Sequence, residues 1–270
     1  MATTDARGRP GCVDHDAAWR QPSLVELLGR PLPELGLLDR SLTRLVSYCV
    51  LHRFRSISGL QHVAATADPF ILALNHSTRL EALALPALLM YHRDGRRVHF
   101  LADWNFQMIP GVGLLYRRSG AIVVTRKSAR PRFLNVLKPL YAHAEPSLER
   151  ARTHLKSGNS VGIFPEGTVN RDPERLLRGR LGAARLSLET GVPIVAGGIR
   201  VVGGTPERPI LDLAFGAPIR PPRAVPGHAA SDKAASADVR LWHSQIMTEI
   251  ARLSGKAWEP LPQEPRHGTP

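Results

Sequence analysis

The segment PFILALNHSTRLEALALPALLMY, from Pro69 to Tyr91, changes its character near the middle. It opens with PFILALN, a short apolar run that is typical of a strand buried on both faces. Its second half, from Glu81 onward, is rich in Leu and Ala, which favour a helix. A buried strand followed by an apolar helix is the repeating unit of layered domains with a parallel sheet. This segment therefore predicts an α/β fold.

Strands and helices continue to alternate after this segment. Apolar runs that predict strands occur at residues 98–103, 120–126, 160–164, 193–202 and 210–219. Helical patterns occur at residues 133–142, 147–158 and 181–191. We therefore expect a single layered α/β domain over residues 56–222, in which helices flank a largely parallel mixed sheet.

A helical segment is expected on each side of this domain. Within an amphipathic segment at residues 23–55, residues 35–54 place apolar side chains at three- and four-residue steps, with arginines between them. This helix would either lie on a membrane or pack on the domain, and we favour packing. Residues 236–254 form a second amphipathic helix. The remaining parts are expected to be a disordered lead (1–22), a linker (223–235) and a tail (255–270).

The charge of the chain is strongly basic. Its 270 residues include 36 Lys and Arg against 23 Asp and Glu, for a formal net charge of +13. This excess favours an anionic partner such as a membrane surface or a phosphorylated small molecule, although a generally arginine-rich proteome would produce it as well. Aromatic residues are not interleaved with the basic ones, so we expect no nucleic-acid partner.

Cysteines and apolar runs suggest where the protein works. Cys12 and Cys49 have no metal-binding neighbours, so we expect neither a disulfide framework nor a metal site. The N-terminal stretch lacks the apolar core of a secretory signal. The longest uncharged apolar run, Ala82 to Tyr91, is too short to span a bilayer. We therefore expect a soluble or peripherally bound protein in a reducing compartment.

His76 is followed five positions later by Glu81, and no other of the eleven histidines has an acid at this distance. Taken alone, Thr78 and Glu81 favour a capping box at the start of a helix. The pair also suits chemistry, because Glu81 would fix the tautomer of His76 and leave its other nitrogen free to take a proton from a hydroxyl. A nearby helix N-terminus would keep the imidazole neutral, as a general base requires. Both roles remain open at this point.

The segment GIFPEGTVNR, from Gly162 to Arg171, leads out of an expected strand into a tight turn. Turns at the carboxyl end of a strand in an α/β sheet face the ligand crevice. In this turn Gly167 allows a close approach of the backbone, Thr168 offers a hydroxyl, and Glu166 offers an acceptor for substrate hydroxyls. These three residues are candidates for substrate binding.

Two arginines are candidates for binding an anionic group. The run IPGVGLLYRRSGAIVVTR predicts a glycine-containing loop and a strand that ends at Arg126. Arg180 lies in the basic run that follows the turn. A guanidinium can hold a phosphate through two parallel hydrogen bonds, which makes both residues suitable for this role.

Taken in order, these segments resemble the glycerolipid acyltransferase family, which includes the 1-acylglycerol-3-phosphate acyltransferases. The resemblance lies in Asn75 and His76 with Glu81 five residues after the histidine, the glycine loop and strand ending at Arg126, the intact Phe-Pro-Glu-Gly-Thr segment at 164–168, and GVPIVAGGI. It covers roughly residues 56–218. Two departures stand out. Glu81 stands where the family most often has Asp, and two uncharged residues separate Thr168 from Arg171.

The resemblance implies transfer of a fatty acyl group from acyl-CoA or acyl-carrier protein to a hydroxyl of a lysophospholipid, first of all 1-acylglycerol-3-phosphate, giving phosphatidic acid. His76 would be the general base and Glu81 would orient it. Substrate binding would fall to Arg126, Glu166, Gly167, Thr168 and Arg180. No cofactor is implied, because acyl-CoA or acyl-carrier protein is the acyl-donor substrate. The resemblance also implies a cytoplasmic protein that binds peripherally to the inner face of the cell membrane, so an anionic membrane surface is an expected partner. The alternatives are a different lipid acceptor, such as a glycolipid or an amino lipid, and a non-catalytic membrane-binding protein.

Overall fold

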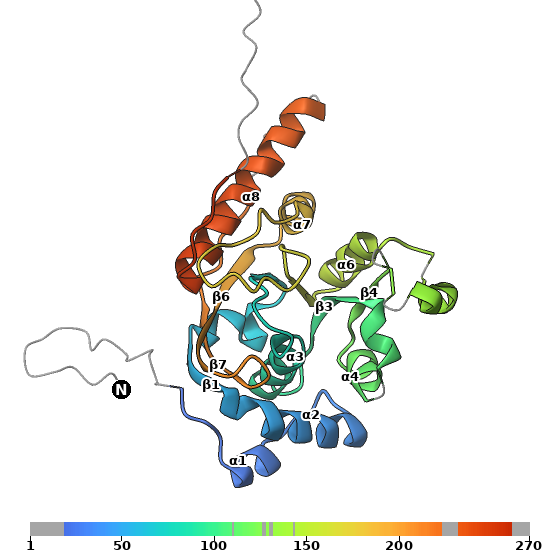
Figure 1. Cartoon of the computed structure of the whole chain (residues 1–270), viewed down its shortest axis with the longest axis vertical. Helices are drawn as coiled ribbons and strands as arrows, with labels where there is room; N and C mark the ends of the chain where they lie inside the picture. Colours follow the sequence, from blue (N-terminus) through green and yellow to red (C-terminus); the bar gives the residue numbers. More distant parts are fainter. Residues whose placement is uncertain are drawn as a thin grey trace, which may run out of the picture.

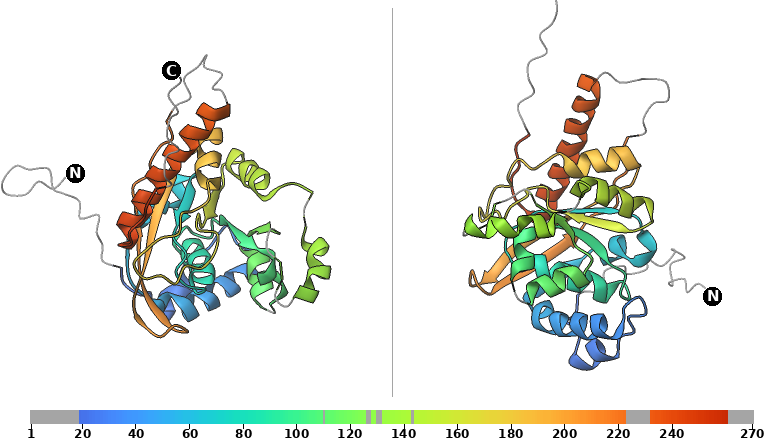
Figure 2. Two further views of the ribbon diagram at one scale, coloured as in Figure 1. Left: turned by 45° about the horizontal axis from the view of Figure 1, so that its top comes forward. Right: turned by 90° about the vertical axis from the view of Figure 1, so that its right-hand side faces the viewer.

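A computed structural model describes residues 19–109, 111–125, 128–129, 132–142, 144–222 and 232–260, with side chains from residue 236 in the last range. Most of the expected lead and tail, residues 223–231 of the linker, and Arg126 lie outside the described residues. Figure 1 and Figure 2 show a central sheet with helices on both of its faces.

The described residues form one seven-stranded sheet with the strand order β1-β7-β6-β2-β5-β3-β4. Its strands are β1 (Phe54–Ser58), β2 (Ile71–Leu74), β3 (Val98–Asp103), β4 (Ile122–Val124), β5 (Ser160–Ile163), β6 (Ile194–Gly204) and β7 (Pro209–Phe215). Neighbouring strands are parallel except β6 and β7, which run antiparallel. The prediction of an α/β fold with a largely parallel mixed sheet is therefore confirmed.

Helices cover both faces of this sheet. The α-helices are α1 (Leu24–Gly29), α2 (Leu37–Val50), α3 (Glu81–His92), α4 (Val112–Arg118), α5 (Lys138–Tyr141), α6 (Ser147–Lys156), α7 (Gly182–Thr190) and α8 (Asp232–Ser254). Leu72 and Leu74 of β2 pack in one apolar cluster with α3, whereas Ile71 and Ala73 pack in another with α6, α7 and α8. Successive side chains of a strand point to opposite faces. The two covered faces explain the unbroken apolar run in the sequence.

The first strand begins where the sequence predicted a helix. β1 starts at Phe54, inside the segment expected to be helical, and pairs in parallel with β7 at one edge of the sheet. Phe54 and Ile57 are buried, and the pairing register shifts between Phe54 and Ser56. Because this irregularity breaks the two-residue alternation, FRSIS carries no recognisable strand pattern. The expectation of a helix as far as residue 54 is therefore wrong.

Helix α2 packs against α3, but part of its expected apolar face points outward. Its buried residues are Thr43, Ser47 and Val50. Leu38 and Leu45, which belong to the amphipathic pattern, are 54% and 60% exposed. The helix therefore does pack on the domain, while leaving an apolar surface uncovered.

The glycine-containing run before β4 includes a helix that the sequence did not predict. Helix α4 follows Gly111, which has a φ of +78°. A Cβ added to Gly113, inside α4, would lie 2.3 Å from the carbonyl oxygen of Gln107. These two glycines serve a turn and a close backbone contact. They suggested a loop because glycine usually weakens helices.

A buried ion pair fastens the end of α3 to the segment before β2. Arg93 is 1% exposed, and its Nη2 donates to both carboxylate oxygens of Asp68 at 2.6 and 2.7 Å. Its Nη1 donates to the carbonyl oxygen of Val63 at 2.6 Å, and its guanidinium carbon lies 5.1 Å from the centre of the Phe70 ring. These contacts fix the relative positions of β2 and α3, and hence the loop that joins them.

We predict that Arg93→Met lowers the free energy of unfolding by about 3–5 kcal/mol, because it leaves the Asp68 carboxylate buried without its main partner. Urea denaturation followed by circular dichroism measures the change. Arg96→Met is the matched control. Arg96 contacts the same carboxylate at 3.4 Å, but its side chain is 44% exposed, so its loss should cost less than about 1 kcal/mol. Equal effects of the two variants would contradict the assignment.

Candidate active site

The two segments expected to carry the chemistry meet at one edge of the sheet. β2 ends directly before Asn75 and His76, and its parallel neighbour β5 ends directly before Phe164. The carboxyl ends of parallel strands lie at the same edge, where ligands bind in α/β folds. The fold therefore brings His76 and Glu166 together, although they are 90 residues apart in the chain.

Asn75 fixes the backbone directly before His76. Its side-chain amide donates to the carbonyl oxygen of Ile199 at 2.8 Å, and its carbonyl oxygen accepts from the Ile199 amide at 2.7 Å. The side chain thus pairs with β6 as a strand residue would, and it is fully buried. Asn75 acts as an extension of the sheet that carries His76 beyond the end of β2.

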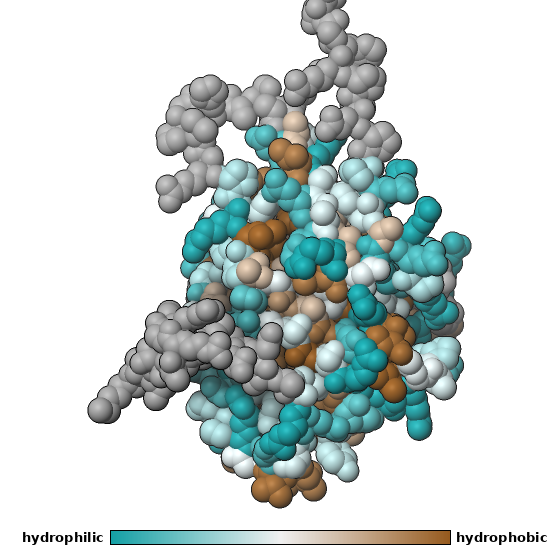
Figure 3. All heavy atoms as spheres, turned by 90° about the vertical axis from the view of Figure 1, so that its left-hand side faces the viewer, coloured by the Kyte–Doolittle hydropathy of each residue, from teal (hydrophilic) through white to brown (hydrophobic). Residues whose placement is uncertain are grey.

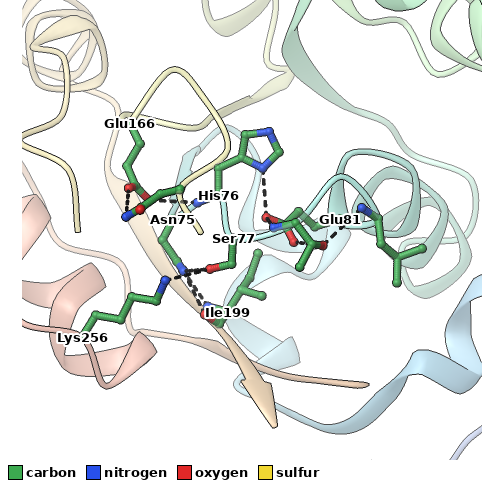
Figure 4. Close-up of polar contacts among 10 residues, drawn as sticks. Asn75, His76, Ser77, Glu81, Glu166, Ile199 and Lys256 are labelled. Atoms are coloured by element: carbon green, nitrogen blue, oxygen red, sulfur yellow. Dashed lines mark hydrogen bonds and ion pairs between the residues drawn. The ribbon is translucent and has the colours of Figure 1, made fainter. Parts of the chain in front are cut away.

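Glu81 is completely buried and accepts hydrogen bonds on both carboxylate oxygens. The amide and the hydroxyl of Thr78 donate to Oε1 and Oε2 at 2.8 and 2.6 Å. Nδ1 of His76 lies 2.9 Å from Oε1. Since the carboxylate acts as an acceptor toward Thr78, Nδ1 is the donor, and in a neutral imidazole the lone pair is then on Nε2. Figure 4 shows the second ring nitrogen pointing away from Glu81.

The Glu81 side chain therefore contacts both His76 and Thr78, the two partners between which the sequence could not decide. Helix α3 begins at Glu81 and is preceded by Leu80, so Thr78 does not cap it. The Thr78 hydroxyl accepts from the Leu80 amide at 3.2 Å instead. Only the Glu81 half of the expected capping box forms. The same carboxylate holds the loop at Thr78 and the ring of His76.

Phe164 holds the imidazole from another side. The ring centroids of His76 and Phe164 are 4.4 Å apart, with 25° between their planes. His76 is 9% exposed. A ring held by a hydrogen bond and a stacking contact has little freedom to turn, so the direction of Nε2 is set before a substrate arrives.

Glu166 faces the interior of the protein. It is 6% exposed, and its Oε1 accepts from the backbone amide of His76 at 3.0 Å. Its Oε2 accepts from the side chain of Asn170 at 2.7 Å and from the amide of Leu177 at 3.0 Å. Both oxygens are engaged within the chain. This geometry favours a positioning role for Glu166 over the expected contact with a substrate hydroxyl.

Asn170 is a site residue that the sequence interpretation missed. Its amide donates to the carbonyl oxygen of His76 at 2.6 Å, and its side chain donates to Glu166 and to the Arg175 carbonyl at 2.7 Å each. It thus closes a ring of contacts between the two segments. The sequence holds no clear signal for this role, because an Asn two residues after Thr168 is equally typical of a turn.

The turn at Gly167 lies against Arg180. Gly167 has a φ of +67°, and a Cβ there would lie 2.7 Å from Nε of Arg180. The Arg180 amide donates to the Pro165 carbonyl at 2.8 Å, which holds the arginine beside the turn. Thr168 is exposed. The sequence-predicted residues Gly167, Thr168 and Arg180 therefore come together within one cleft.

This cleft has a volume of about 1170 Å³ and contains His76 in its wall. Four arginines line it among the described residues: Arg79, Arg171, Arg180 and Arg185. The acidic residues in the wall are Asp103 and Glu145, so the lining carries a positive excess. Burial raises the pKa of Tyr116, also in the wall, well above its usual value, so this phenol stays neutral. The cleft suits a ligand with an anionic group.

A second, apolar pocket of about 30 Å³ adjoins the cleft and is lined by α2, α3 and α4. Ala82, Pro86, Tyr116 and Ser119 line both spaces. Its other walls include Leu42, Val46 and Met90. The shared residues connect the surroundings of His76 with the side of α2 that faces α3. An alkyl chain would have to widen this pocket by moving side chains.

We predict that Glu166→Gln lowers the free energy of unfolding by about 1–3 kcal/mol, because the new amide group would face at least one backbone or side-chain donor. Urea denaturation measures this loss. Glu174→Gln serves as the control in the same loop, because Glu174 is exposed. A Glu166→Gln protein as stable as the control would show that the buried carboxylate is not required.

Comparison with known proteins agrees with these observations. A family model described as Acyltransferase matches residues 55–200, more than half of the chain. The 1-acyl-sn-glycerol-3-phosphate acyltransferases of chloroplasts from Brassica napus and Arabidopsis thaliana are each 27% identical over 139 and 140 residues. Each alignment covers 52% of this chain but 35% and 34% of the relatives, so the chain spans about a third of their length.

A solved structure shows the same fold. The crystal structure of the 1-acyl-sn-glycerophosphate acyltransferase from Thermotoga maritima matches with a TM-score of 0.52 and 17% identity, over 82% of each chain. The resemblance seen in the sequence is thereby confirmed, and the chain belongs to the acyltransferase family.

Proposed function

We propose that the protein transfers a fatty acyl group from a thioester to a hydroxyl of a lysophospholipid. The observation that carries the proposal is the oriented His76. Its Nδ1 is bonded to buried Glu81 at 2.9 Å, and its ring lies in the wall of an arginine-lined cleft. A neutral histidine whose tautomer is fixed by a carboxylate is suited to act as a general base.

The reaction follows from this arrangement. Nε2 of His76 takes the proton of the acceptor hydroxyl while the hydroxyl oxygen attacks the thioester carbonyl. The tetrahedral intermediate then expels the thiolate, which takes the proton from the imidazolium. An ester and a free thiol result, without an enzyme nucleophile or a cofactor. Glu81 stabilises the imidazolium and keeps its ring in place. This differs from a serine-type triad, because the attacking oxygen belongs to the substrate.

The acceptor we propose is 1-acylglycerol-3-phosphate, the compound in the names of the plant relatives. Its phosphate would meet the arginines of the cleft, with Arg180 beside the turn and Arg126 as a further candidate, and Thr168 would offer its hydroxyl to the glycerol. The donor would be acyl-CoA or acyl-carrier protein, because both bring anionic groups to a basic cleft. The apolar pocket between α2 and α3 would receive an alkyl chain.

A membrane surface is the proposed source of the acceptor. Helices α1 and α2 expose a group of large apolar residues: Leu24, Val25, Leu28, Leu37, Leu38, Leu45 and Tyr48. Figure 3 shows hydrophobic side chains gathered at the end of the molecule where α1 lies in Figure 1. We call this group the α1–α2 surface. Among the described residues, no helix is both long and apolar enough to cross a bilayer. We propose that this surface docks on the inner face of the cell membrane.

A second acceptor class is favoured by one observation. The family often has a basic residue directly after the third segment, where this chain has Val169. The next residue, Asn170, turns inward to Glu166 at 2.7 Å. The nearest basic residue of that loop, Arg171, is exposed in the cleft wall. A lipid with a different headgroup, such as a glycolipid or an amino lipid, is therefore the alternative acceptor.

We predict that His76→Ala lowers kcat by at least about a hundredfold, because general-base catalysis contributes about 10²–10⁴ to rate. Release of free thiol from acyl-CoA in the presence of lysophospholipid measures the rate. His52→Ala is the control, since His52 is exposed and outside the cleft. Full activity in the His76 variant would rule out this mechanism. A wild-type protein inactive with every donor and acceptor would instead favour a non-catalytic binding protein.

The acceptor is tested with a panel. We expect the highest kcat/KM with 1-acylglycerol-3-phosphate, against lysophospholipids with larger headgroups, a glycolipid and an amino lipid, each with acyl-CoA and acyl-carrier protein in parallel. Thiol release and product chromatography measure the transfer. A clear preference for an acceptor without a phosphomonoester would replace the proposed substrate with the alternative.

We predict that Leu37→Glu combined with Leu45→Glu weakens binding to anionic vesicles more than tenfold, because each leucine contributes about 1.5–3 kcal/mol when buried in an apolar phase. Co-sedimentation with phosphatidylglycerol vesicles measures this. Leu241→Glu on α8 is the control, since Leu241 is as exposed as Leu45, at 60%. The double variant and the control should both be as stable as the wild type. Equal vesicle binding by the double variant and the control would exclude the α1–α2 surface as the docking site.

A further inference from the structure

A short segment after α8 runs along the loop that follows the Phe-Pro-Glu-Gly-Thr turn. The amide of Ala257 donates to the Glu174 carbonyl at 2.7 Å, and the amide of Leu176 donates to the Ala257 carbonyl at 2.9 Å. Arg175 and Ala257 thus form a parallel bridge between two distant parts of the chain. This segment lies beyond the residues 55–200 that match the family model.

Lys256, in this segment, turns its side chain inward beneath the active site. Its ammonium donates to the hydroxyl of Ser77 at 3.2 Å and to the backbone carbonyl of Asp172 at 2.7 Å. Lys256 is 9% exposed. Lysine is almost never buried to this degree without partners, because desolvation of an ammonium costs several kcal/mol. Figure 4 shows the Lys256 side chain reaching toward Ser77 and Asn75.

The partner Ser77 connects Lys256 to the residue proposed as the base. Ser77 directly follows His76, and its hydroxyl oxygen also accepts from the Asn75 side chain at 2.9 Å. Asn75 in turn holds the β6 backbone at Ile199. The ammonium is therefore bonded to Ser77, which follows the two residues that matter most in this loop. Asn75 anchors the loop to the sheet, and His76 carries the imidazole.

The other partner of Lys256 is Asp172, which belongs to the loop that holds Glu166. The side chain of Asp172 accepts from the amides of Glu174 and Arg175 at 2.8 and 3.0 Å, so the loop is already turned when its carbonyl meets Lys256. Lys256 thus joins three parts of the chain: the His76 loop, the loop after the turn, and the segment after α8.

The charge of Lys256 suits this place. Burial lowers the pKa of its ammonium, and the carboxylates of Glu166, Asp172 and Glu81 oppose that shift. Glu81 and Glu166 are themselves buried, at 0% and 6% exposure. A cation beside two buried carboxylates reduces the cost of keeping them charged, whereas an apolar side chain of the same length would not.

We propose that Lys256 is a positioning residue for His76, which holds the loop at Ser77 in the geometry that catalysis requires. The inference rests on the proposed function of His76. It assigns no contact with substrate to Lys256, because the ammonium is engaged by Ser77 and Asp172 on the inner side of the loop.

The test compares Lys256→Met with Lys256→Arg in the full-length protein. Met keeps the length of the side chain without its charge and donors, whereas Arg keeps the charge. We expect Lys256→Met to lower kcat about ten- to a hundredfold with little change in the KM for acyl-CoA, and Lys256→Arg to recover part of the loss. Arg252→Gln is the control with unchanged activity, because Arg252 is an exposed residue of α8 paired with Glu249.

Hydrogen–deuterium exchange provides a readout that does not depend on activity. In Lys256→Met the amides of residues 75–80 should exchange at least tenfold faster, while those of β2 and β5 stay protected. If Lys256→Met does not fold, Ser77→Ala removes the same contact and should give the same pattern. Unchanged exchange and unchanged kcat in a folded variant would overturn the proposal, as would faster exchange with a normal kcat. If the wild type transfers no acyl group, the proposed function fails, and exchange alone decides whether Lys256 positions the loop.

Discussion

The hydrogen bond from the His76 amide to the Glu166 carboxylate, 3.0 Å long, is the contact on which the site depends. It joins the end of β2 to the turn after β5, so the two most recognisable segments of the chain become one structure. Asn170 reinforces the joint by bonding the His76 carbonyl and the other Glu166 oxygen. A backbone held on both its donor and its acceptor cannot shift without breaking buried hydrogen bonds, each of which is costly to leave unmade.

The charge balance around the contact between His76 and Glu166 involves three distant parts of the chain. Glu81 and Glu166 are buried carboxylates, and each satisfies its oxygens with donors from loops. Donors lower the cost of burying a carboxylate but leave its charge uncompensated. Lys256 supplies the nearby positive charge from the segment directly after α8, a helix that packs on the sheet. The candidate site is therefore held in part by contacts from the C-terminal part of the chain.

The sequence predicted the architecture well where hydrophobic pattern alone decides it. β2 is buried on both faces, so its apolar run is unambiguous, and β3 has the predicted bounds Val98–Asp103. Prediction failed where a tertiary contact overrides local pattern. β1 is an edge strand with an irregular register, and α4 contains a glycine that backbone packing requires. The face of α2 was misjudged for a related reason, since Thr43 and Ser47 are buried although neither is apolar, and Thr43 contacts Met90 of α3.

At the site as well, the sequence indicated which residues take part but not where their side chains point. Sequence motifs identified His76, Glu81, Gly167, Thr168 and Arg180, and all five lie around or directly behind one cleft. A motif does not state where a side chain points, however, and Glu166 points inward although neighbouring residues of its turn line the cleft. The sequence carries no signal that points to Lys256, because its role depends on the contact with Ser77 at 3.2 Å, which only the fold creates. A motif therefore indicates which residues gather at the site. Whether one of them contacts the substrate or positions a neighbouring residue is decided by its buried hydrogen bonds.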